Sequence, residues 1–128
     1  MMKPYVLLGM SFVMGWAKGP DPGAVEREKP FLDENDAAMR RMMAGMTVQP
    51  SGDVDRDFVA MMAPHHQGAI DMAIAELRHG RNSQLRRLAQ EIIVTQQEEI
   101  AAMHLALGEP LPPSIASPTT PPAATGTR

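Results

Sequence analysis

A link of three residues, Gly80-Arg81-Asn82, joins two long segments whose apolar residues recur with helical periodicity. Asp53 suits the N-cap of the first segment, and Gly80 suits the left-handed residue that ends many helices. Because a link this short holds neighbouring helices side by side, the sequence predicts an antiparallel hairpin of helices over residues 53–79 and 83–107.

A third helix is predicted before the hairpin. The acidic and Asn residues from Asp33 suit a helix N-terminus, residues 37–46 are good helix formers, and the Gln49-Pro50-Ser51-Gly52 segment ends the pattern. We expect this shorter, methionine-rich helix of residues 35–46 to pack across the hairpin, which gives an all-α domain over residues 33–108. Three short helices bury a marginal core, so association into a homodimer with a larger bundle is a further expectation.

The segments on either side of this domain have different compositions. Residues 1–17 combine the early Lys3 with an apolar run, which is the pattern of a secretory signal peptide. Cleavage is expected after Ala17, with an uncleaved anchor as the alternative, although the run is shorter than the roughly 20 apolar residues of a transmembrane helix. Residues 18–32 are expected to be a linker and residues 109–128 a disordered Pro-rich tail. The expected location is the periplasm or the cell exterior.

Charge, cysteine content and motifs exclude several classes of function. The net charge of -3 gives no basic excess, so no nucleic-acid partner is expected, and the lack of cysteine excludes disulfides and thiolate chemistry. The zinc-protease, phosphate-loop and serine-elbow motifs are also missing from the sequence. A ferritin-like di-iron site needs two Glu-x-x-His motifs, and the sequence has one, at Glu76 to His79. We therefore expect no enzyme, with an acid–base role for His65 or His66 and Glu99 as the weakest alternative.

Sulfur and imidazole side chains are concentrated in the first helix of the hairpin. Residues four apart stack on nearly one side of a helix, so Met61 lies below His65 and Met62 lies below His66. Met72 returns to within about 20° of the direction of His65. Because adjacent positions diverge, the two histidines are expected to face different neighbours, which makes two Met/His pairs.

Two further patterns on the flanking helices bear on this cluster. One side of the predicted first helix carries four methionines and no Leu, at positions Met39, Met42, Met43 and Met46. These residues are either a functional stripe or the buried side of an amphipathic helix. In the last helix, Gln96 and Glu99 interrupt a predicted apolar stripe. They are expected either to bond to His65 or His66 or to lie at the edge of the bundle. The remaining members of that predicted stripe are Leu85, Ala89, Ile92, Met103 and Ala106.

Methionine and histidine together point to copper. The thioether is a soft ligand and imidazole is borderline, so such a site favours copper, and Cu(I) more than Cu(II), over magnesium, calcium or manganese. The alternative is a non-catalytic module that binds a partner through a Met-rich apolar surface and holds no physiological metal. The candidate ligands are Met39, Met42, Met43, Met46, Met61, Met62, His65, His66, Met72 and Met103, with Gln96 and Glu99 as partners that orient them.

The segment Pro64-His65-His66-Gln67-Gly68-Ala69, together with residues 96–103, resembles a known family. Over residues 35–107 the chain is similar to the ferritin-like family catalogued as domain of unknown function 305, which includes periplasmic copper-binding proteins of the CopM type. The resemblance implies a small helical bundle, export, and copper binding or copper resistance through Met and His. We expect the protein to sequester copper or to transfer it to another copper-handling protein. The family pattern falls on Met61, Met62, His65, His66, Met72, Gln96, Glu99 and Met103.

Overall fold

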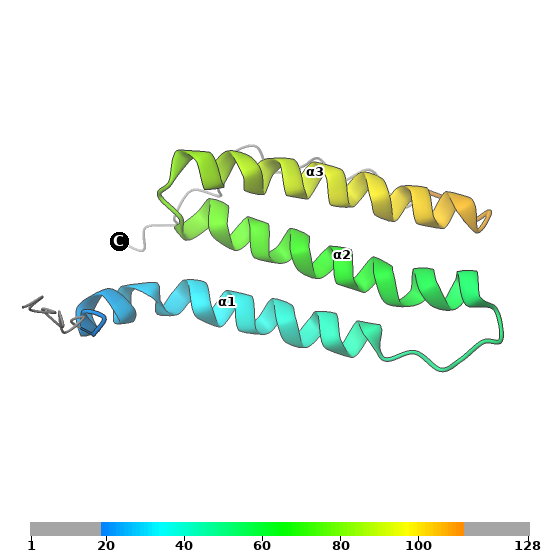
Figure 1. Ribbon diagram of the computed structural model, residues 1–128, viewed down its shortest axis with the longest axis horizontal. Coiled ribbons are helices and arrows are strands. Elements are labelled where there is room, and N and C mark those ends of the chain that lie inside the picture. Colours follow the sequence, from blue (N-terminus) through cyan, green and yellow to red (C-terminus); the bar gives the residue numbers. More distant parts are fainter. Residues whose placement is uncertain (1–18, 112–128) are drawn as a thin grey trace, which may run out of the picture.

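The computed structural model describes residues 19–111 and forms an all-α fold of three helices, with no strand in that part of the chain (Figure 1). Helix α1 spans Pro22–Met46, α2 spans Val54–His79 and α3 spans Ser83–Ala106. Helix α2 lies between the other two and contacts both, whereas α1 does not contact α3 (Figure 1). The molecule is therefore a single layer of three helices, and α1 lies beside the hairpin instead of packing across it as expected.

The predicted hairpin of α2 and α3 is confirmed. The Asp53 carboxylate accepts hydrogen bonds from the backbone N–H groups of Asp55 and Arg56 at the start of α2, and Asn82 caps α3 in the same way. The expected left-handed conformation of Gly80 is wrong, because its φ is -72°. The glycine is needed for space instead, since a Cβ atom there would lie 2.7 Å from the carbonyl oxygen of Glu76.

Helix α1 begins much earlier than the sequence predicted. It starts at Pro22, so the expectation of a linker over residues 18–32 is wrong for most of that range, and α1 is about as long as the other helices. The side chain of Asp21 accepts from the N–H of Gly23, and Pro22 occupies the first helical position, where its missing N–H has no cost. The predicted signal peptide and most of the Pro-rich tail lie outside the described residues.

The main hydrophobic core lies between α2 and α3. Its buried members are Ile70, Ala73 and Leu77 on α2 and Ala89 and Ile93 on α3. The predicted stripe of α3 is therefore only partly right. Ala89 is buried and Ile92 packs against the core, but the centre of the stripe is Ile93, while Leu85 is 51% exposed and Ala106 is also exposed.

Close backbone approach holds α1 against α2. A Cβ atom at Gly45 would lie 2.7 Å from the Cβ of Pro64, and one at Gly68 would lie 2.7 Å from the sulfur of Met42. Ala38 on α1 and Ala75 on α2 are both 1% exposed, which is consistent with a tight contact of small side chains.

No helix within residues 19–111 has the length and hydrophobicity to cross a membrane.

Candidate metal centre

Ion pairs mark one edge of the contact between α1 and α2. The guanidinium of Arg41 donates to Asp71 at 2.8 Å, and Glu34 accepts from both Arg78 and His79. The hydrogen bond from Arg78 is the main cause that lowers the pKa of Glu34 below its usual value, and His79 contributes further. This edge is therefore charged and paired.

The opposite edge of the same contact carries sulfur and imidazole. At about 100° per residue, Asp71 and Arg78 lie on one side of Gly68, whereas Met61, His65 and Met72 lie on the other. The same geometry on α1 places Glu34 and Arg41 on one side of Met42. Met39, Met43 and Met46 lie on the other side of Met42, so the two sets of ligand candidates share one edge.

His66 extends this arrangement from α2 to α3. Its Nε2 lies 2.8 Å from Oε2 of Glu99, and the amide of Gln96 donates to the same oxygen at 3.1 Å. The prediction that one of the two histidines bonds to Gln96 and Glu99 is confirmed for Glu99. The Glu99 side chain is 50% exposed, so the pair also lies at the edge of the layer, and the two alternatives from the sequence are both partly right.

Both ring nitrogens of His66 have hydrogen-bond partners. Its Nδ1 lies 2.9 Å from the carbonyl oxygen of Met62, and its Nε2 is bonded to the carboxylate of Glu99. A metal ion that binds at Nε2 has to displace the Glu99 carboxylate.

His65 lies on α2 between the methionines at the α1 contact and His66, which faces α3. Its ring centroid lies 6.1 Å from that of His66 in an edge contact. The expectation of different neighbours is correct for His66, which turns to α3, whereas His65 is exposed and has the ring of His66 as its neighbour. The rings of the two histidines therefore lie on the same broad side of α2.

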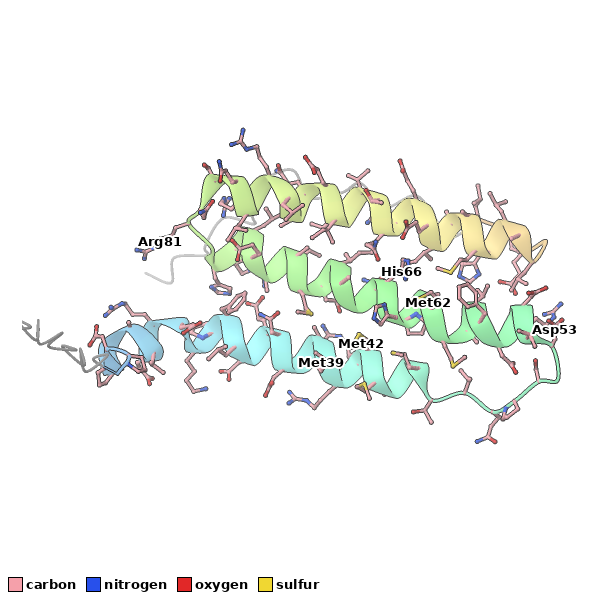
Figure 2. All side chains as sticks on the ribbon, in the orientation of Figure 1. Met39, Met42, Asp53, Met62, His66 and Arg81 are labelled. Carbon is pink, nitrogen blue, oxygen red and sulfur yellow. The ribbon has the colours of Figure 1, made fainter. Side chains whose placement is uncertain are left out.

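Together these contacts place nearly all ligand candidates on one broad face of the layer. Helical geometry places Gln96, Glu99 and Met103 on the same side of α3, to one side of Ile93. The bond between His66 and Glu99 shows that this side of α3 lies next to His66 on α2. Figure 2 shows Met39, Met42, Met62 and His66 near the middle of the layer, away from the ends marked by Asp53 and Arg81. We call this surface the methionine-histidine face. Its members are Met39, Met43, Met46, Met61, Met62, His65, His66, Met72, Gln96, Glu99 and Met103.

The members of the methionine-histidine face differ in exposure. Met39, Met61 and Met72 are about 40% exposed, and Met43 is 58% exposed. Met46, Met62 and Met103 are half-buried, as is Met42, which packs on Gly68 beneath the face. Met42 is therefore the one candidate that the structure places mainly in a packing role.

The other histidines lie away from this face. His104 bonds through Nδ1 to Glu109 at 2.6 Å and lines a hollow of about 510 Å³ with Pro64. No pattern in the sequence predicts this hollow. Within residues 19–111, no group of three or more His, Asp and Glu side chains is placed to hold a metal ion. A metal ion on the methionine-histidine face would therefore need thioether ligands beside imidazole, which is the donor set that suits copper.

Comparison with known proteins gives one match. A family model described as "Domain of unknown function (DUF305)" matches residues 10–107 of the chain. No curated protein and no solved structure matches.

Proposed function

The chain belongs to the DUF305 family, and we propose that it is an exported protein that binds copper, mainly as Cu(I), through the methionine-histidine face. It would sequester the ion or transfer it to another copper-handling protein, and so contribute to copper homeostasis or resistance. This role needs ligands and no catalytic group.

The observation that carries the proposal is the convergence of sulfur and imidazole from three helices on one face. Met39 and Met46 come from α1, His65 from α2 and Met103 from α3. An amphipathic helix that only filled a core would bury its methionines, whereas Met39, Met43, Met61 and Met72 are between 39% and 58% exposed. Exposed apolar side chains gathered on one surface mark a binding site, which supports a role of these thioethers in binding.

The chemistry of the face favours the cuprous ion. Cu(I) accepts two to four soft ligands, and the closeness of His65 to Met61 and Met72 by helical geometry offers several such combinations. Hard cations prefer carboxylate clusters, and the carboxylate of Glu99 is already bonded to His66. Glu99 bonds to Nε2 of His66, and Gln96 donates to the same carboxylate oxygen, so His66 would become a ligand when copper replaces Glu99 at Nε2.

The test is a Cu(I) titration of the purified protein under anaerobic conditions against a competing chelator. We expect the combined variant Met61→Leu, His65→Ala and Met103→Leu to lose affinity by roughly 100-fold or more, because the loss of even supporting groups costs about 10- to 100-fold. His104→Ala is the matched control, since His104 lies outside the face and pairs with Glu109. Equal affinities for the wild type and the triple variant would refute the proposed site.

The second candidate function is a partner-binding module without metal. The partly exposed methionines also fit a promiscuous apolar surface. A ligand that binds only the folded state raises the melting temperature, by an amount that grows with concentration over Kd. We therefore expect Cu(I) to raise Tm by several degrees in the wild type and by much less in the triple variant. An unchanged Tm in both proteins would favour the second candidate.

A further inference from the structure

The layer of three helices has two broad faces of different character. The face with the Arg41–Asp71 and Arg78–Glu34 pairs is charged, and its exposed large apolar residues on α3 are Val94 and Leu105. The methionine-histidine face carries a longer series of exposed apolar side chains. By helical geometry these include Met39, Met43, Phe58, Met61, Met72 and Leu85, each between 39% and 58% exposed.

A domain normally buries such a face against a second layer. Stable architectures pack at least two layers around a core, and the described residues form one layer because α1 and α3 each contact only α2. The methionine-histidine face is therefore an apolar surface for which the described residues supply no cover.

The size and charge of the face fit a second copy of the same chain. With helices about 9 Å apart and about 39 Å long, the layer presents roughly 1,000 Å², above the about 800 Å² per partner of a standard interface. On this face the residues of α2 between Phe58 and Met72 include no Asp, Glu, Lys or Arg, and the carboxylate of Glu99 on α3 is bonded to His66, so two copies can meet without placing unpaired like charges together. The opposite face has a similar area but carries the Arg41–Asp71 and Arg78–Glu34 pairs.

We propose that two copies of the chain associate through their methionine-histidine faces, and that copper binds between them with ligands from both copies. A face-to-face dimer has its twofold axis in the plane of contact, so the centre of one face meets the centre of the other. His65 lies at the middle of the central helix, which brings the two His65 residues next to each other. The shared metal rests on the proposed copper binding, whereas the dimer itself does not.

Cross-linking tests the orientation, because the chain has no native cysteine. Ala69 lies on the methionine-histidine face near its centre, and Ala60, nine residues earlier, lies about 180° away on the opposite face. We expect a short bis-maleimide to cross-link the purified full-length chain with Ala69→Cys into dimers, and to leave the Ala60→Cys chain largely monomeric. Equal cross-linking of the two variants, or none in either, would overturn the proposal.

Sedimentation with matched face variants provides an independent measurement. Phe58→Asp with Leu85→Asp places two charges on the methionine-histidine face without changing a proposed ligand, and Val94→Asp with Leu105→Asp does so on the opposite face at similar exposure. At tens of micromolar we expect the wild type and the second variant to be dimers and the first to be a monomer. Circular dichroism checks that each variant is folded.

The two proposals fail in different ways. A wild type that sediments as a monomer with and without Cu(I) overturns the dimer, even if it binds copper tightly. A dimer that forms in the presence of a copper chelator but binds no Cu(I) supports the interface and removes the proposed function. If both hold, we expect one shared site to give one copper ion for every two protein chains. We also expect the Phe58→Asp and Leu85→Asp variant to bind Cu(I) at least about tenfold more weakly, because half of the ligands leave with the partner.

Discussion

At the residue scale, the contact of Met42 with Gly68 connects packing to the site. A Cβ atom at Gly68 would lie 2.7 Å from the sulfur of Met42 and 3.0 Å from its Cβ and Cγ atoms, so the clash involves the whole side chain. Gly68 therefore sets how closely α1 approaches α2, and with it the distance between Met39 or Met46 and the ligand candidates of α2.

We expect Gly68→Ala to lower the free energy of unfolding by about 1–3 kcal/mol, because the added methyl group overpacks a tight helix contact. Urea unfolding at neutral pH measures the change. Gly19→Ala is the control, since no heavy atom lies within 4 Å of a Cβ at that position. Combining Gly68→Ala with Met42→Ala should recover part of the loss, and a double variant no more stable than the single one would contradict the assigned clash.

At the scale of helices, local signals were enough to predict the hairpin. Asp53, Gly80 and Asn82 mark the helix ends by short-range chemistry, and these bounds are confirmed. The sequence does not predict the start of α1, because Pro22 and Pro30 favour a linker. In the structure Pro22 occupies the first helical position, where a proline has no cost, and Pro30 lies inside the helix. The register of α3 was shifted because the burial of Ile93 depends on α2, and periodicity alone does not give the facing direction.

The candidate site was predictable to a similar degree. Spacing on one helix gave the Met/His pairs, and the polar Glu99 in an apolar stripe gave its bond to His66. The common face of the three helices could not be predicted, because it depends on α1 lying beside α2 instead of across the hairpin. That placement is fixed by contacts far apart in the sequence, such as Gly45 with Pro64 and Arg41 with Asp71.

The edge of α1 and α2 at Glu34 should make stability depend on pH. The hydrogen bond from Arg78 lowers the pKa of Glu34 in the folded protein, so the unfolded chain takes up the proton first as pH falls. The stabilisation is therefore present above the usual pKa of a glutamate, and it is lost as pH falls through the lower pKa of the folded state. Partial exposure of Glu34 limits it to less than about 1 kcal/mol.

Comparing urea unfolding at pH 7 and pH 3 checks this expectation. We expect Glu34→Gln to destabilise the protein at pH 7 and to have a smaller effect at pH 3, where protonation removes part of the stabilisation. Arg78→Gln should behave alike, and the double variant should lose no more than the larger of the two single losses, because both residues belong to one pair. Additive losses at pH 7 would show that the pair is not the source.

At the scale of the whole molecule, stability should decline from the centre of the layer outward. The buried cluster around Ile93 joins α2 and α3, whereas residues 22–30 of α1 are all exposed. Local opening costs least where few apolar contacts are lost. Hydrogen exchange followed by mass spectrometry should show the fastest exchange in residues 22–30 and the slowest in the middle of α2 and α3. Protection of residues 22–30 equal to that around Ile93 would contradict this order.

The arrangement of α2 between its two neighbours in the sequence also bears on how the chain folds. Every contact between helices joins α1 to α2 or α2 to α3, so each helix packs only against a helix that is adjacent to it in the sequence. Folding rates rise as the sequence separation of contacts falls, and helical proteins of low contact order fold in microseconds to milliseconds. A chain of this topology reaches its folded state quickly wherever it first meets folding conditions, so its apolar core residues are exposed to water only briefly.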